Sequence, residues 1–252
     1  MIRFYLAGVL LLAQPIAALT SETVVLEPSQ DNTLYETALD QDGQQFEMSN
    51  GSGSFLFAGR TGQDGGFKRR RALLQFDLLS ILPADVEIVF AQLSMYQSKA
   101  APDSSPVNMG LHRVLQQWGE AGSNASGPEG QGIQAETGDA TWHHRIYPDD
   151  LWDTSGGSYA ITPSAITVVG QLQQHYSWSC DDALLEDLRY WQNNPELNFG
   201  WAVIGGEAGS SSAHRFNSRQ HSSTDQRPQL TIIYQAKGTV FSDSFEQFIG
   251  CP

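Results

Sequence analysis

Two groups of arginines are the first candidates for chemistry in this sequence. Arg69, Arg70 and Arg71 are consecutive, and a second basic segment contains Arg215 and Arg219. A guanidinium group binds carboxylate or sulfate through two parallel hydrogen bonds. Because neighbours on a strand point to opposite faces, Arg69 and Arg71 should share one face and Arg70 the other. We expect Arg70, Arg215 and Arg219 to contact an anion. The alternative is a solvated strand start paired with nearby acids.

Aromatic residues are concentrated between residues 118 and 159, in a polar, glycine-rich part of the chain. Sugar rings stack on flat aromatic faces through their C–H groups. We expect Trp142 and Trp152 to be stacking platforms, with Trp118, Tyr147 and Tyr159 nearby in sequence. The alternative is that these side chains belong to the core, where tryptophan is usually buried.

Motifs for catalysis or metal binding are scarce. The sequence has no G-x-S-x-G, H-E-x-x-H, P-loop or G-x-G-x-x-G motif. His143 and His144 are adjacent, and on a strand they would point apart, so we do not expect them to share an ion. We predict no enzyme activity and no required cofactor. A structural calcium fits an acidic β-protein, with Asp31 a candidate ligand, but the sequence does not identify its metal ligands.

The charge balance excludes one class of partner. The chain of 252 residues has 14 Lys and Arg against 28 Asp and Glu, a formal net charge of −14. Such a surface repels DNA and RNA, so we expect no nucleic-acid binding. An anionic polysaccharide would also be repelled at long range. At marine salt the screening length falls below about 8 Å, so a local arginine site can still bind one.

The first residues predict export. A short basic start, an apolar run and small residues near Ala18 are typical of a signal peptide over residues 1–18. The apolar run is too short to span a bilayer, and no later segment is longer. In an oxidising compartment Cys180 and Cys251 can form a disulfide. It would close a loop of about 70 residues and stabilise the fold by about 4 kcal/mol. Two free thiols are the alternative.

Short segments of alternating apolar residues predict an all-β fold. They cover residues 23–26, 72–78, 86–95, 107–111 and 230–234, with a one-residue phase shift near residue 90 that indicates a β-bulge. Residues 28–32 read as a turn. One helix near 181–193 is indicated by Leu184, Leu188 and Trp191 at helical spacing. We therefore predict an antiparallel β-sandwich or jelly roll with one short helix.

Glycine-rich residues 43–66 and 117–140 are predicted to be long loops. The alternation ends before residue 237. The predicted organisation is a signal peptide at 1–18, one β-sandwich domain at 19–236 and a C-terminal tail at 237–252.

Several phrases resemble those of a known family. They are Arg71–Leu78 (RALLQFDL), Ala91–Tyr96 (AQLSMY), Val107–Arg113 (VNMGLHR) with Trp118–Glu120 (WGE), Ala140–Trp142 (ATW), Trp152–Gly157 (WDTSGG), Asn193–Trp201 (NNPELNFGW), Arg215–Arg219 (RFNSR) and Arg227–Tyr234 (RPQLTIIY).

In this order the phrases resemble a DNRLRE domain, the group that includes family 96 carbohydrate-binding modules. The resemblance spans about residues 23–235. It implies a non-catalytic β-jelly roll, secreted by bacteria or archaea, whose relatives in some cases bind alginate. The family often has Ser-Arg-Glu where this chain has Ser218, Arg219 and Gln220.

The resulting expectation is a carbohydrate-binding module that is secreted to the cell exterior or to a bacterial periplasm, with a polysaccharide partner such as alginate. An extracellular structural or adhesion protein is the alternative, and a polysaccharide lyase or hydrolase is a third. With 28 acidic residues, a pair of carboxylates spaced for glycoside hydrolysis cannot be identified from the sequence.

Overall fold

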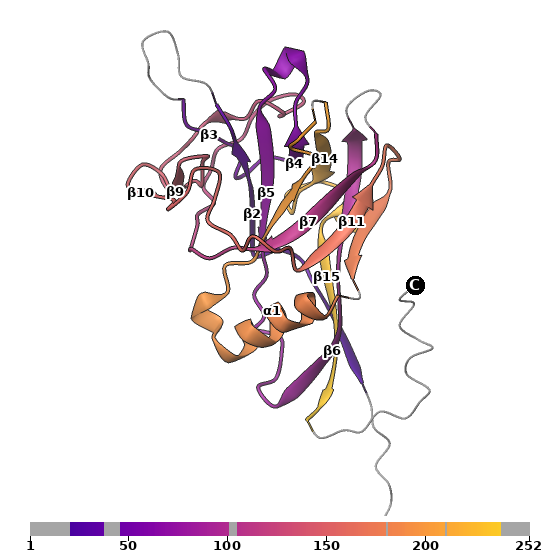
Figure 1. Cartoon of the computed structure of the whole chain (residues 1–252). Helices are drawn as coiled ribbons and strands as arrows, with labels where there is room; N and C mark the ends of the chain where they lie inside the picture. The colour runs from indigo at the N-terminus through magenta and orange to yellow at the C-terminus, as the bar shows by residue number, and fades with distance from the viewer. Residues whose placement is uncertain (1–20, 38–45, 101–104, 180, 210, 238–252) are drawn as a thin grey trace, which may run out of the picture.

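One long strand, β6 (Val86–Ala100), organises the fold. The computed structural model describes residues 21–37, 46–100, 105–179, 181–209 and 211–237 (Figure 1). In β6 the buried positions alternate, and their phase changes midway. Ile88 pairs with Tyr234 and Phe90 with Ile233, so one residue of β6 between them has no partner. This is the predicted β-bulge, and it is confirmed.

The strands form one large curled antiparallel sheet. Its order is β1 (Glu22–Leu26), β15 (Gln229–Ala236), β6, β14 (His214–Asn217), β4 (Phe55–Arg60), β5 (Arg69–Gln75), β13 (Trp201–Gly205), β7 (Val107–Arg113) and β11 (Ala165–Val169). In addition, β12 (His175–Ser179) pairs with β6, and β2 (Gln30–Tyr35) pairs with β5. The all-β, sandwich-like fold class is confirmed.

Short elements complete the described part of the chain. Two small ladders join β3 (Met48–Ser49) to β8 (Ile133–Gln134) and β9 (His144–Ile146) to β10 (Asp150–Leu151). Three single-turn 3₁₀ helices are η1 (Gln63–Gly65), η2 (Pro195–Leu197) and η3 (Thr224–Gln226).

The predicted helix is present as α1 (Asp182–Asn193). It buries Leu184, Leu188 and Trp191 in the main core, as their spacing indicated. Figure 1 shows α1 beside β6, away from the turn that carries η1. None of the helices in the described ranges has the length and apolar character needed to cross a membrane.

A second, smaller core lies outside the sheet. Leu34 of β2, Leu73 of β5 and Ala202 of β13 pack there against Trp118, Trp142 and Trp152. The segment between β7 and β11 therefore folds over the outer face of these strands. A long connection of this kind covers apolar surface that the curled sheet cannot bury by itself.

Two local predictions were wrong. Residues 28–32 are not simply a turn, because β2 begins at Gln30 and buries Asp31 and Asn32. The predicted loop at 43–66 contains β3 and β4, while the one at 117–140 contains only β8. The predicted signal peptide, Cys180, Cys251 and residues 238–252 of the predicted tail lie outside the described residues.

Candidate functional site

A cavity of about 340 Å³ lies beside the turn that joins β4 to β5. Its walls come from this turn, from β14, from the end of β6 and from the loop around residue 130. Three of its lining residues are cationic and one is acidic. We call it the basic cavity, defined by Phe57, Asp64, Arg70, Lys99, Gly130 and Arg215.

Arg70 lies at the base of the basic cavity and is only 2% exposed. Its guanidinium carbon lies 4.9 Å from the ring centroid of Tyr35. Its Nη1 donates hydrogen bonds to the carbonyls of Glu36 (3.2 Å) and Arg69 (2.8 Å), and its Nε donates to that of Gly130 (3.2 Å). Burial lowers the pKa of Arg70, but an arginine stays charged.

The predicted role of Arg70 is thereby corrected. Its Nε and Nη1 donate to backbone carbonyls and its Nη2 donates to Oε1 of Gln131, so it does not offer a guanidinium fork to a ligand. It places a buried positive charge under the cavity instead. In a region of low dielectric, this charge attracts an anion more strongly than an exposed arginine would.

Lys99 and Arg215 form the cationic rim of the cavity. They are directly opposite each other on β6 and β14. Nε of Arg215 donates to the hydroxyl of Ser98 at 3.0 Å, and its guanidinium carbon lies 3.8 Å from the ring centroid of Phe55. Like charges directly opposite on neighbouring strands destabilise a sheet. An anion bound between them would remove this repulsion.

No carboxylate in the described ranges forms an ion pair with Arg70, Lys99 or Arg215. The arginines of the same chain that lie outside this cavity mostly have such partners. The positive potential of the basic cavity is therefore balanced only in part, by the exposed Asp64 on its rim and by Glu129 and Glu36, which act electrostatically on Arg215 and Arg70.

His214, also in the cavity wall, is a buried titratable group. Its Nδ1 lies 2.7 Å from the carbonyl of Ser212, and its Nε2 lies 3.2 Å from that of Gly170. A neutral ring can donate to only one of them. Burial lowers the pKa of His214, which favours the neutral ring at pH 7.

Trp142 and Trp152 are buried, at 4% and 5% exposure. The Trp142 ring lies between two guanidinium carbons, those of Arg69 and Arg71, each 4.8 Å from its centroid. Nε1 of Trp152 donates to the carbonyl of Thr141 at 3.0 Å. The expectation that these rings present a stacking face is corrected, because the β7–β11 segment carries them into the second core.

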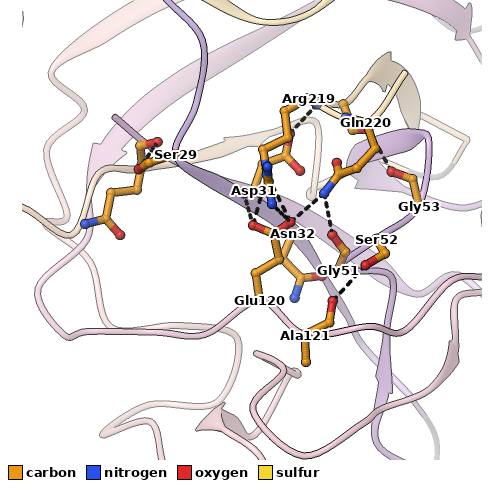
Figure 2. A network of polar contacts seen from close by, with 12 residues as sticks. Ser29, Asp31, Asn32, Gly51, Ser52, Gly53, Glu120, Ala121, Arg219 and Gln220 are labelled. Carbon is orange, nitrogen blue, oxygen red and sulfur yellow. Dashed lines mark hydrogen bonds and ion pairs between the residues drawn. The ribbon is translucent and has the colours of Figure 1, made fainter. Parts of the chain in front are cut away.

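Arg219 binds an anion, but one that belongs to the protein. Its Nη2 lies 2.7 Å and its Nε 3.0 Å from Oε1 of Glu120. Figure 2 shows Arg219 and Gln220 converging on Glu120, with Asp31 adjacent. The backbone N–H of Arg219 donates to Oδ2 of Asp31 at 2.7 Å, and that of Asp31 donates to Oε2 of Glu120 at 2.9 Å. The guanidinium of Arg219 is therefore engaged within the fold.

Gln220 explains why an amide suits this position. Its Nε2 donates both to Oε1 of Glu120 and to the carbonyl of Gly51. A glutamate at this position would face Glu120 with a like charge. The polar network thus depends on one amide, one guanidinium and two carboxylates.

Burial, with a smaller contribution from the neighbouring Glu120, raises the pKa of Asp31 to about 8. The hydrogen bond from Arg219 opposes this increase. Burial also raises the pKa of Glu120, against the effect of its bonds to Arg219. Asp31 is therefore a structural group within the network. In the described ranges no group of three or more His, Cys, Asp or Glu side chains is placed to hold a metal ion, and the structural calcium stays a prediction.

His143 and His144 do not point apart as expected. Their Nδ1 atoms lie 3.1 Å and 3.5 Å from Oε1 and Oε2 of Glu47, respectively. Strand β9 begins only at His144, so the preceding bend removes the alternation that the prediction assumed. Each imidazole faces its own oxygen of one carboxylate.

Lys99 was missed by the sequence reasoning. The predicted strand ended at Met95, and extending its alternation would have placed Lys99 on the buried face, with Met95 and Gln97. A second register shift, which leaves Ser98 without a partner on β14, turns Lys99 to the exposed face instead. Its position opposite Arg215 depends on strand pairing between distant segments, which a single sequence does not show.

No protein-family model matches this chain, and a search of curated proteins found no match. The similarity to DNRLRE domains therefore stays a prediction based on the sequence phrases.

Proposed function

We propose that this chain is a secreted, non-catalytic carbohydrate-binding module of the DNRLRE type, with an acidic polysaccharide such as alginate as its ligand. The observation that carries the proposal is the pairing of Lys99 with Arg215 across two strands, over the buried charge of Arg70. In a chain with twice as many acids as bases, one cavity is lined by three cations that form no ion pair with a carboxylate in the described part of the chain.

The cavity also has an apolar part that suits a sugar ring. Phe57 and Pro128 line this part. A ring that carries a carboxylate would pack its C–H face against this surface and direct its charge to Lys99 and Arg215. A neutral sugar would leave those cations unpaired, so affinity should be selective for acidic chains.

The alternative function, a structural or adhesion protein, is favoured by a different surface. Ile166 and Val168 are exposed on one face of β11, the last strand in the sheet order, and the preceding Ile161 is 92% exposed. Apolar residues on an edge strand can pair with another protein chain. Self-association that depends on Ile166 and Val168, without polysaccharide binding, would favour this function.

The test uses calorimetric titration with alginate of the mature protein and of two variants. Lys99→Gln removes one rim charge at an exposed site, and Arg215→Lys keeps the charge but removes the guanidinium fork. We expect each variant to bind about tenfold more weakly, because a hydrogen bond to a charged group contributes about 1.5 kcal/mol.

Lys237→Gln is the matched control, since it removes an exposed lysine that forms no ion pair within the described residues and does not line the cavity. Circular dichroism of all variants verifies folding. If Lys99→Gln and Arg215→Lys both bind alginate as tightly as the unchanged protein and the control do, the basic cavity is not the site and the proposal fails.

A further inference from the structure

A second cavity, of about 640 Å³, lies on the other side of the same β4–β5 turn. We call it the outer cavity, defined by Glu36, Arg60, Phe67, Lys68, Arg69 and Glu207. The two cavities share this turn as a wall, because residues 61, 62, 64 and 65 line the basic cavity and residues 66–69 line the outer one. Successive residues of β5 face different cavities, Arg69 the outer and Arg70 the basic.

The carboxylates of the outer cavity are already bound within the protein. Glu36 accepts two hydrogen bonds from the side chain of Arg69, at 2.8 Å and 3.0 Å. Glu207 accepts two from Arg71, at 2.6 Å and 2.8 Å. The Arg69 hydrogen bond lowers the pKa of Glu36 to about 2, so this group stays ionised and paired.

Arg60 and Lys68 keep their charge available. Neither forms an ion pair within the described ranges. Nε of Arg60 donates to the carbonyl of Phe67 at 2.8 Å, and its Nη1 donates to that of Glu207 at 3.4 Å. The outer cavity therefore has two cations with no ion-pair partner among the described residues, although the charge of Lys68 acts on Glu36.

The distribution of such cations over the molecule is uneven. Of the thirteen lysines and arginines in the described ranges, six form ion pairs with carboxylates. Of the seven that do not, five line the two cavities: Arg60, Lys68, Arg70, Lys99 and Arg215. The other two, Arg189 and Lys237, lie elsewhere. A band of positive charge thus crosses the β4–β5 turn.

The turn itself presents an aromatic ring. Phe67 is 44% exposed and has a backbone φ of +55°. A bulky residue rarely adopts this left-handed conformation, and such strain is typical of positions held for function. Glycines at positions 62, 65 and 66 keep the turn free of other bulky side chains. A chain that passes over the turn would meet the Phe67 ring between the two cavities.

We propose that the ligand is a linear polyanion that crosses the β4–β5 turn and occupies both cavities at once. This inference rests on the proposed function and specifies its substrate: an extended chain with a carboxylate or sulfate on successive sugar units. The basic cavity binds one acidic unit against Lys99 and Arg215. The outer cavity binds another against Arg60 and Lys68, and Phe67 packs against the intervening sugar.

Chain length is the variable that tests this inference. The full mature protein is titrated by calorimetry with an alginate disaccharide and with a long alginate oligosaccharide. Occupation of a second site on one ligand raises the overall affinity without new types of contact. We expect the long oligosaccharide to bind at least about tenfold more tightly than the disaccharide.

Variants at the turn separate the two cavities. Lys68→Gln removes an outer charge, and Phe67→Gly removes the ring at a backbone conformation that glycine adopts easily. Both should reduce affinity for the long oligosaccharide toward that of the disaccharide. Lys237→Gln should change neither affinity.

The outcomes distinguish this inference from the proposed function. Equal affinity for the two lengths, or a long-chain affinity that both turn variants retain, overturns the two-cavity ligand while the basic cavity remains a binding site. If neither ligand binds to the folded protein, the proposed function itself fails.

Discussion

Replacing Asp31 by asparagine should change how the free energy of unfolding depends on pH. Asp31 is buried within strand β2, and its Oδ2 accepts the N–H of Arg219. Burial raises its pKa from 3.8 to about 8. Asparagine has nearly the same shape and keeps a carbonyl oxygen for that N–H, but it cannot ionise.

The direction of this pH dependence follows from the protonation of Asp31 in the native and in the unfolded state. Between pH 5 and pH 7 the native Asp31 holds a proton, whereas in the unfolded chain it has released it. Unfolding therefore releases a proton, and a rise in pH favours the unfolded state. The slope is about 1.4 kcal/mol per pH unit for one proton, so Asp31 lowers the stability by about 2.7 kcal/mol over these two units.

Urea unfolding of the unchanged protein and of Asp31→Asn at pH 5, 6 and 7 measures this difference. We expect the variant to gain stability relative to the unchanged protein as the pH rises, by about 2.7 kcal/mol between pH 5 and pH 7. Asp153→Asn, at an exposed aspartate, is the control and should follow the unchanged protein. If the free energies of unfolding of the unchanged protein and of Asp31→Asn change in parallel with pH, Asp31 is not protonated in the folded protein.

Three further substitutions test other parts of the structure by urea unfolding at pH 7. Glu120→Gln should lower the stability by about 2 kcal/mol, because it removes the buried charge that is hydrogen-bonded to Arg219, a residue about one-third exposed. A change below about 0.5 kcal/mol would contradict this. Trp142→Ala should lower it by about 3–5 kcal/mol through the cavity left in the second core; a near-neutral effect would mean that the ring is not packed there. Gly200→Ala should destabilise by more than about 1 kcal/mol, because Gly200 has a φ of +71° and an added Cβ would lie 1.9 Å from the carbonyl oxygen of Leu74; an unchanged midpoint would show that the backbone shifts freely.

Much of the sheet could be predicted because its pattern is local. The alternation of β5, β6, β7 and β15 and the bulge in β6 follow from which residues face the core. Strand β2 was missed because Asp31 and Asn32 are polar and follow turn-forming residues. They are buried because Glu120, Ser49 and Arg219, from distant segments, supply their hydrogen bonds.

The candidate site was predicted only in part for the same reason. Alternation placed Arg69 and Arg71 on one face and Arg70 on the other, and the aromatic rings that these arginines contact bear this out. Whether an arginine or lysine forms an ion pair depends on carboxylates that are distant in sequence, as Glu120 is from Arg219. The burial of Trp142 likewise depends on how a long connection folds over the sheet, and residue types alone do not determine this.

Binding of an acidic polysaccharide is tested by calorimetric titration of the protein with alginate and with a neutral glucan, at low and at marine salt. We expect saturable binding of alginate that weakens as salt rises, because the basic cavity attracts the ligand by charge, and no binding of the glucan. Flat heats with alginate at both salt concentrations, in a protein that is folded, would contradict this expectation. Equal affinity for the neutral glucan would do the same.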